Sequence, residues 1–251
     1  METSGNTILI TGGGSGIGRG LAEALHARGN TVIIAGRRQS ALDETTAANP
    51  GMASMTLDVE RADEVRAFAA KVAAAYPSLN VLINNAGIMR AEDLRAQPDD
   101  LADAEAMVVT NLLGPIRLTA ALLPTLRKQP RSAVVNVSSG LAFVPLAITP
   151  TYSATKAALH SYTESLRAQL AGTTTEVIEV IPPAVQTDLM PGSKTNPRGM
   201  SLDAYISEVM SLLDAHPGAP EVNVERVKLL RDAAAEGRYA EVFQMLNGAP
   251  R

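Results

Sequence analysis

The stretch TYSATKAAL at positions 151–159 holds two side chains whose types and spacing suit proton transfer. Tyr152 and Lys156 stand four residues apart, about one helical turn, so in a helix both would leave the same face. An ammonium group beside a phenol lowers the pKa of that phenol from its usual ~10. The pair is therefore either a solvated helix surface or an acid with a lowered pKa.

Two serine hydroxyls follow the apolar run SAVVNV, which is typical of a buried strand. Ser138 and Ser139 would then lie at a carboxyl end of the sheet, where the helix with Tyr152 also begins. A carbonyl that receives a hydride needs a proton, which Tyr152 could donate while a serine hydroxyl holds the same oxygen. We expect Tyr152 to be the general acid, and Lys156 to tune its pKa and to bind a ribose.

The helical stretch TNLLGPIRLTAALL places a proline one turn after Asn111. Pro115 has no N–H to donate to the carbonyl of Asn111, so this carbonyl loses its helical hydrogen bond. A freed carbonyl can hold a water, which would give a proton path from solvent to Lys156. The alternative is a kink that serves packing alone.

The sequence ILITGGGSGIGRGLAEAL passes from a strand through glycines into a helix. Glycine has no Cβ, so backbone N–H groups can reach a diphosphate at the positive end of the helix. The glycines at 12, 16 and 18 have a Gly-x-x-x-Gly-x-Gly spacing, because Ile17 interrupts the usual dinucleotide fingerprint. This loop predicts a bound dinucleotide, and the alternative is a flexible turn.

The next strand ends in Ala35-Gly36-Arg37-Arg38, without the acidic residue that accepts from the ribose of NAD. A guanidinium group suits a 2′-phosphate instead. We therefore expect NADP(H) in preference to NAD(H), with Arg37 as the principal contact and Arg38 as the second. The alternative is two solvated arginines that open a helix.

Two further strand ends face the same region. Asp58 follows the third strand, where it could accept from an adenine amine or cap a helix that starts near Glu60; both interpretations stay open. The sequence NNAG at 84–87 follows the fourth strand, beside the point where a doubly wound sheet reverses its strand order. Small residues there leave room for a cofactor, unless they only form an Asn/Gly turn.

Apolar runs rich in Val and Ile alternate with amphipathic stretches up to Ile181. This alternation predicts a single Rossmann-type α/β domain, with a doubly wound parallel sheet and helices on both faces. The expected strands are 6–11, 30–36, 52–57, 80–84, 132–138 and 175–181. The expected helices are 17–28, 60–75, 101–127 and 153–171.

After Ile181 the chain becomes rich in Pro, Gly and Thr. We interpret 183–222 as a partly mobile substrate-side loop or lid insertion, and the C-terminal part as a helical extension. Helices are expected near 202–214, 222–236 and 238–246. Apolar side chains here could line a lid over the cofactor or belong to the core. They are Met190, Met200, Leu202, Tyr205, Ile206 and Met210.

Composition disfavours several other classes of function. The 251 residues are 46% apolar with a net charge of −4 and a pI of about 5.5, which argues against nucleic acid and anionic membranes as partners. The chain has no cysteine, and its three histidines lack ligand spacing, so we expect no metal site. METSGN has no basic-then-apolar pattern and no uninterrupted apolar run nears ~18 residues, so we expect a cytoplasmic protein.

Five motifs in order, TGGGSGIG, NNAG, the Asn111 region, Ser139 and YSATK, resemble the classical short-chain dehydrogenase/reductase family over about residues 6–190. The resemblance selects Ser139 over Ser138, because Ser139 lies thirteen residues before Tyr152. It implies a Rossmann fold and a small-molecule substrate. The implied catalytic tetrad is Asn111, Ser139, Tyr152 and Lys156.

The same resemblance implies a homodimer or homotetramer that packs through the helices near 101–127 and 153–171. The cofactor-binding residues that we expect are Gly12, Gly14, Ser15, Gly16, Ile17, Gly18, Arg37, Arg38, Asp58, Val59, Asn85, Ala86, Gly87, Tyr152, Lys156, Pro182, Val185 and Thr187.

The sequence departs from the family pattern in two places. Pro182-Pro183-Ala184 replaces the usual Pro-Gly after the sixth strand, although Thr187 still fits the residue that contacts the carboxamide. No C-terminal strand ending in a glycine pair is visible and helices stand in its place, which puts a seventh strand in doubt. The tail VERVKLLRDAAAEGRYAEVFQMLN is similar to a subgroup named for teichoic-acid D-alanylation.

The sequence thus predicts an NADP(H)-dependent oxidoreductase that transfers a hydride between the nicotinamide and a carbonyl or secondary alcohol. It does not identify that substrate. Two alternatives stay open. One is a sensor or scaffold that binds NADP(H) without turnover, and the other is an isomerase or epimerase that uses the hydride and returns the cofactor.

Overall fold

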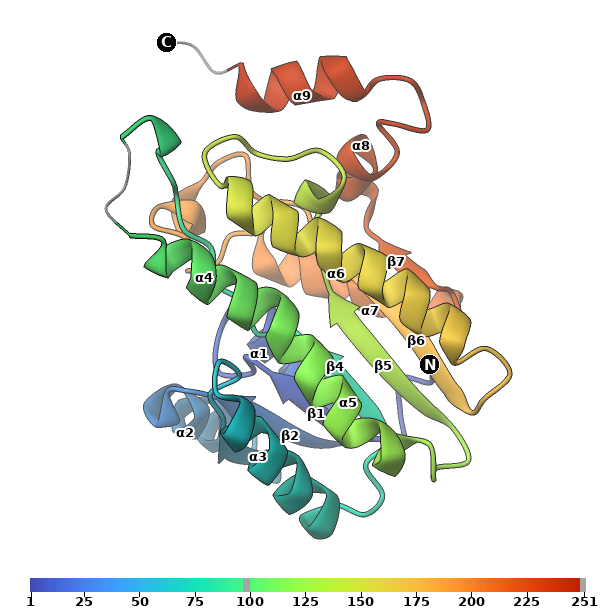
Figure 1. The fold of residues 1–251 in the computed structure, drawn as a ribbon. Helices are drawn as coiled ribbons and strands as arrows, with labels where there is room; N and C mark the ends of the chain where they lie inside the picture. Colours follow the sequence, from blue (N-terminus) through green and yellow to red (C-terminus); the bar gives the residue numbers. More distant parts are fainter. Residues whose placement is uncertain (97–99, 249–251) are drawn as a thin grey trace.

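The computed structural model describes residues 1–96 and 100–248. A seven-stranded sheet in the order β3-β2-β1-β4-β5-β6-β7 runs through the molecule, and all neighbouring strands are parallel (Figure 1). The strands are β1 (Thr7–Thr11), β2 (Thr31–Gly36), β3 (Ala53–Thr56), β4 (Val81–Asn84), β5 (Ser132–Val137), β6 (Thr175–Ile181) and β7 (Glu221–Asn223). The order reverses between β1 and β4, which confirms the predicted doubly wound Rossmann-type fold.

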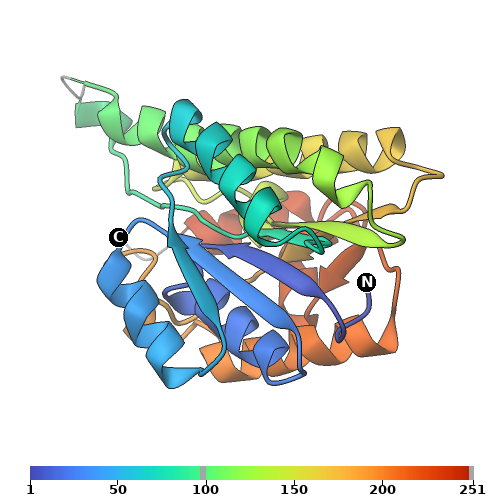
Figure 2. The ribbon, with the colours of Figure 1, turned by 90° about the horizontal axis from the view of Figure 1, so that it is seen from below.

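Helices cover both faces of the sheet (Figure 2). The helices are α1 (Gly16–His26), α2 (Gln39–Ala48), α3 (Ala62–Ala75), α4 (Ala102–Val108), α5 (Gly114–Leu126), α6 (Pro150–Gln169), α7 (Leu202–Ala215), α8 (Lys228–Arg231) and α9 (Tyr239–Asn247). One face packs against α1, α2 and α7, and the other against α3, α5 and α6. The sheet is therefore buried on both sides.

Alternation along the strands divides the core into two layers. In β1, Ile8 and Ile10 join the cluster with α1 and α7, whereas Leu9 joins the cluster with α3 and α5. In β2, Ile33 and Ile34 divide in the same way. Each fully buried aliphatic side chain of this kind contributes about 1.5–3 kcal/mol relative to an exposed one.

The predicted helix 101–127 is one continuous helical segment, Ala102–Leu126, with a π-helical turn at Val109–Leu113 between α4 and α5. Pro115 follows this turn and cannot donate to the carbonyl of Asn111, which accounts for the widened turn there. The segment is long and apolar enough for a membrane span by length and composition. In this fold it packs against α3 and α6, as a core helix does.

The structure contains the seventh strand that the sequence had put in doubt. β7 pairs with the end of β6, from Glu179–Glu221 to Ile181–Asn223, where a helix 222–236 was expected. Only α8 is α-helical within that range, after a 3-10 turn at Glu225–Val227. Three residues with one apolar side chain are too short a strand for a period of two to show in the sequence.

The segment between β6 and β7 has two parts. Residues up to Ser201 form turns, tied by a bridge between Val185 and Met200. After them, α7 packs against α1, so closely that a Cβ on Gly20 would lie 2.7 Å from the side chain of Ile206. Tyr205 on α7 is fully buried.

Candidate active site

The glycine loop presents backbone rather than side chains to the crevice. Gly12 has a φ of 69°, in the left-handed region, and its amide donates to the Ala35 carbonyl at 2.7 Å. A Cβ on Gly18 would collide with the side chain of Asn85 and with the Gly12 carbonyl. α1 begins at Gly16, and the Ser15 side chain does not cap it. The first-turn amides therefore keep their capacity to bind an anion.

The NNAG segment closes onto this loop through a residue that the sequence interpretation missed. The Thr11 hydroxyl accepts from the backbone amides of Asn85 and Ala86 at 3.0 and 3.1 Å. The Asn85 side chain returns a hydrogen bond to the Thr11 carbonyl at 2.9 Å. These contacts hold the ends of β1 and β4 together at the reversal of strand order.

A cavity of about 180 Å³ opens at these strand ends. Its lining includes eight of the eighteen residues that were expected to bind the cofactor, and it adds Leu57, Ala41 and Thr110 among others. The predicted residues that line it are Gly12, Gly14, Ser15, Arg37, Arg38, Val59, Ala86 and Gly87. A hollow beside a positive helix end, with two guanidinium groups and a glycine at the end of β2, fits a phosphorylated nucleotide.

The two arginines have different partners. Arg37 Nη1 lies 2.7 Å from Glu60 Oε1, and the hydroxyl of Thr110 donates to the same oxygen at 3.0 Å. Arg38 Nη2 donates to the Ser15 hydroxyl in the glycine loop at 3.2 Å. Glu60 thus partly neutralises Arg37, and its pairing was not visible in the sequence. Half of the Arg37 side chain is exposed, so this ion pair is weak.

Asp58 stabilises a turn in the loop and does not cap the helix, because α3 begins at Ala62 with Arg61 as its N-cap residue and no side chain caps it. Oδ1 of Asp58 accepts from the amide of Glu60 at 3.0 Å, two residues before α3 begins. Val59, next to it, lines the cavity.

The four residues of the expected tetrad lie close together and are buried. Lys156 Nζ donates to the Val137 carbonyl at 2.9 Å and lies 5.6 Å from the ring centroid of Tyr152. A Cβ on Gly87 would touch both Asn111 Oδ1, at 3.2 Å, and Lys156 Nζ, at 3.7 Å. Gly87 also lines the cavity at the strand ends, so the tetrad borders it.

Each tetrad residue is held by its own local contacts. Asn111, in the π-helical turn, exchanges two hydrogen bonds of 2.9 Å with the backbone of Ile88. Its side chain also donates to the Thr155 hydroxyl at 3.2 Å. The Ser139 hydroxyl accepts from the amide of Leu141 at 3.1 Å, which begins a 3-10 turn (Gly140–Ala142). The site is thus assembled from the π turn, the end of β5 and the first two turns of α6.

The pKa values correct one expectation. Burial raises the pKa of Tyr152 to about 12, opposed by the neighbouring Ser139 hydroxyl, although a lowered pKa was expected. Burial also lowers the pKa of Lys156 to about 8. Both groups are desolvated, and Lys156 directs its ammonium group to Val137, so loss of solvation outweighs the attraction between them.

The residues that follow β6 reach the same region. The Pro182 carbonyl accepts from the amide of Gly140 at 2.9 Å, next to Ser139. A Cβ on Gly16 would lie 3.4 Å from the side chain of Thr187, which places Thr187 beside the glycine loop. Val185 is buried and bridges to Met200.

An apolar cluster surrounds Tyr152. Of the apolar residues proposed for a lid, Met190 belongs to it, whereas Tyr205, Ile206 and Met210 belong to the main core. Met200 and Leu202 pack against that core. The sequence interpretation missed the other members of the cluster, which are Met89, Met107, Ile88, Leu141 and Leu146.

The C-terminal helices hold the loop between β5 and α6 from outside (Figure 1). A Cβ on Gly140 would lie 2.9 Å from Leu230. The Asn247 side chain accepts from the amide of Ala147 at 2.6 Å and donates to the Pro145 carbonyl at 3.0 Å. This support of the Ser139 loop has no sequence motif.

Comparisons with known proteins agree with this geometry. A model of the short chain dehydrogenase family matches residues 6–197. The chain is 41% identical over 251 residues to a Bacillus subtilis (strain 168) protein named uncharacterized oxidoreductase DltE, covering 98% of each chain.

Two solved structures are similar over nearly the whole chain. A short-chain dehydrogenase from Streptomyces avermitilis has a TM-score of 0.83 at 29% identity, covering 97% of each chain. A short chain dehydrogenase from Burkholderia cenocepacia J2315, in complex with NADP, has a TM-score of 0.81 at 26% identity, covering 98% of this chain and 100% of that one. The chain belongs to the short-chain dehydrogenase/reductase family of oxidoreductases.

Proposed function

We propose that this chain is an NADP(H)-dependent oxidoreductase that reduces a carbonyl compound to a secondary alcohol, or catalyses the reverse reaction, with Tyr152 as the general acid. One observation carries the proposal. The tetrad residues are buried together at the border of a cavity that the glycine loop and two arginines line. Among similar structures, the Burkholderia cenocepacia protein is a complex with NADP.

The cofactor, when bound, would supply the hydride, so this chain must supply the proton. Tyr152, with a pKa raised to about 12, is protonated at neutral pH and donates to the carbonyl oxygen. The Ser139 hydroxyl beside it holds the same oxygen. Lys156, with a pKa of about 8, remains mainly an ammonium ion at neutral pH. It favours the phenolate that forms when the proton leaves.

The residues proposed to hold the cofactor fall into three groups. The glycine loop and the start of α1 receive the diphosphate, and Arg37 and Arg38 receive a 2′-phosphate. Thr187, beside Gly16, receives the carboxamide, as the family pattern implies. The lid role is proposed for 183–200 only, because α7 lies in the core.

The NADP(H) preference can be tested by charge reversal. We expect Arg37→Asp or Arg38→Asp to lower the NADPH/NADH affinity ratio by at least about tenfold, because a carboxylate repels the 2′-phosphate. Arg61→Asp makes the same change in net charge on a side chain that pairs with Glu64 and does not line the cavity. It should leave the ratio unchanged. An unchanged ratio in both test variants would contradict the preference.

Turnover is tested by NADPH consumption with a panel of ketones, aldehydes and sugars. The proposal expects net oxidation of NADPH with at least one of them. Product formation without net NADPH oxidation would show an isomerase or epimerase. Binding of NADPH without turnover across the panel would favour the sensor.

We further propose a homodimer or homotetramer that packs through α5 and α6, and a cytoplasmic location. An open hollow at the end of α5 offers Ala120, Leu123 and Pro124 for such packing, with Arg127 and Lys128 at its side. Light scattering of the purified chain would show a mass of two or four copies, and a monomer would contradict the proposal.

A further inference from the structure

A row of polar residues crosses the sheet at one level, through four neighbouring strands. The strand registers pair each member with the next. The row consists of Asn84, Asn136, Glu179 and Glu221. Residues in register on parallel strands point to the same side of the sheet, so the four side chains lie next to one another. We call them the polar row.

The β4 and β5 members of the polar row are neutral and satisfied. Asn84 donates to the Asn136 side chain at 2.8 Å and to the Thr119 hydroxyl on α5 at 3.0 Å. Asn136 donates to the Thr163 hydroxyl on α6 at 2.9 Å. The row therefore faces the α5 and α6 side of the sheet.

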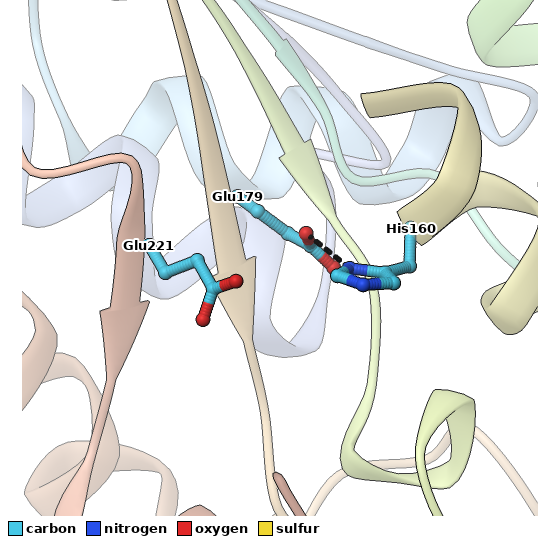
Figure 3. Close-up of side chains that lie close together, drawn as sticks. All are labelled: His160, Glu179 and Glu221. Carbon is cyan, nitrogen blue, oxygen red and sulfur yellow. Dashed lines mark hydrogen bonds and ion pairs between the residues drawn. The ribbon is translucent and has the colours of Figure 1, made fainter. Parts of the chain in front are cut away.

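The β6 and β7 members are charged (Figure 3). Glu179 Oε2 lies 2.8 Å from His160 Nδ1 on α6, and the Glu179 side chain is fully buried. Arg231 on α8 donates to both oxygens of Glu221, at 2.9 and 2.8 Å. Its guanidinium group also lies 4.6 Å from the ring centroid of Phe143, which packs edge-on against His160 at 4.7 Å.

His160, Glu179 and Glu221 have the side-chain types of a metal site, with ligand atoms within 4.8 Å of one another. The contacts of Glu221 argue against a metal. Arg231 occupies both of its oxygens and brings a positive charge that would repel a cation. The hydrogen bond to Glu179 raises the pKa of His160, so this site is a network of ion pairs.

The network adjoins the tetrad through α6. Lys156 and His160 are one helical turn apart, so they leave the same face of α6. Lys156 bonds the carbonyl of Val137, which follows Asn136 in the row, and Asn136 is in register with Glu179. Within the described part of the chain, Oε1 of Glu179 accepts no hydrogen bond. Its charge therefore acts on its surroundings through space.

Lys156 needs such a charge because it is buried. Burial lowers its pKa, and the Glu179 carboxylate opposes this fall. Tyr152 and His160 are the other titratable groups of α6 near it. On α4, which also packs against α6, Asp103 and Glu105 are exposed to solvent. Of the carboxylates on β6 and α4, Glu179 is the buried one, and its charge raises the pKa of Lys156.

We propose that Glu179, held in place by His160, is a positioning residue whose carboxylate keeps Lys156 an ammonium ion. The inference rests on the proposed function, because the charge of Lys156 matters for the proton transfer from Tyr152. Glu179 lies outside all five sequence motifs.

The test is an NMR titration of ¹³Cε-labelled lysine in the full chain without added substrate, with the Lys156 signal assigned by its loss in Lys156→Met. The wild type is expected to titrate with a midpoint near pH 8. Glu179→Gln should lower that midpoint by about one unit, because it removes an opposite charge from a buried cation. Glu179→Asp keeps the negative charge, so its Lys156 midpoint should stay close to that of the wild type.

The matched control is Thr163→Val, which breaks a buried hydrogen bond of the same row on the same helix without changing any charge. It should destabilise the chain but leave the Lys156 midpoint unchanged. If the single Gln variant fails to fold because His160 loses its partner, Glu179→Gln/His160→Gln replaces the whole ion pair by neutral side chains. A smaller downward shift is then expected, because the positive charge of His160 is lost together with the negative charge of Glu179. An unshifted midpoint in the Gln variants, or an equal shift in Thr163→Val, would overturn the proposal.

Two further measurements distinguish the role of Glu179 from the proposed reductase function and from a metal site. In the reductase assay, the alkaline limb of kcat/KM should move to lower pH in Glu179→Gln by the shift seen in the titration. Since the titration needs no turnover, its failure would leave the proposed function standing. A protein without reductase activity could still show the shift. A rise in Tm on addition of Zn²⁺, lost in Glu221→Gln, would identify a metal site and overturn the ionic role.

Discussion

The two halves of the sheet build their parts of the site by different means. Around β1, β2 and β4, glycines without side chains leave the space of the cavity, and Gly12 and Gly18 pack against Asn85. Around β5 and β6, the site consists of buried polar and titratable side chains, with Tyr152 and Lys156 at its centre. Substitutions in the first half should affect cofactor binding by filling the space that the glycines leave. Substitutions in the second half should affect charge and proton transfer.

Removal of the ammonium group in the second half should have a larger effect than the glycine, pH and Asn247 changes described after it. We expect Lys156→Met to lower carbonyl reduction by about 100-fold or more, since the phenolate of Tyr152 loses its stabilising charge. The dissociation constant of NADPH, measured by fluorescence titration, should change much less. Loss of NADPH binding with an unchanged rate of reduction would show that Lys156 binds the cofactor and does not support proton transfer.

A methyl group in the first half should have a smaller effect of the opposite kind. Gly18→Ala puts a Cβ into the Asn85 side chain and the Gly12 carbonyl, so NADPH affinity should fall by about tenfold or more. Gly29→Ala, a control with φ of 80° and open space around its Cβ, should cost stability without loss of affinity. Equal affinities in the two variants would contradict the steric role of Gly18 in the glycine loop.

The pH dependence should report the second half alone. Lys156 is charged below its pKa of about 8 and neutral above it, so kcat/KM for reduction should fall by up to about tenfold per unit above that pH. NADPH binding through the glycine loop should vary less over the same range. A constant kcat/KM up to pH 10 would argue against a role for the charge of Lys156.

The smallest effect concerns the support of the second half by the C-terminal helix. Asn247→Ala removes the bonds to Ala147 and Pro145, which should cost about 1 kcal/mol of unfolding free energy per lost bond. Denaturant unfolding measures this cost. KM should rise more than kcat falls, because the loop packs beside Tyr152 without donating a proton. An unchanged stability would show that α9 does not brace the loop.

The first half of the molecule was the easier one to predict. Its strands are long apolar runs, and the glycines after β1 form a turn whose spacing can be recognised in one sequence. The interruption before Pro115 was also predictable, since proline removes a specific hydrogen bond. The positions of Tyr152 and Lys156 on one helix face followed from their spacing alone.

The remainder depends on contacts between distant residues. β7 is a strand because it pairs with β6, since Glu221-Val222-Asn223 has no periodicity of its own. The raised pKa of Tyr152 comes from burial, which the spacing of Tyr152 and Lys156 does not encode. Glu60 beside Arg37, and Glu179 beside His160, are pairings that only the folded chain creates.

The most direct test of the proposed function compares wild type with Tyr152→Phe, using a carbonyl compound that the wild type reduces. We expect Tyr152→Phe to bind NADPH with an affinity close to that of the wild type. Its rate of reduction should fall by about 10²–10⁴-fold, because the phenol no longer supplies the proton. Reduction by Tyr152→Phe at the wild-type rate would contradict the assignment of Tyr152 as the general acid.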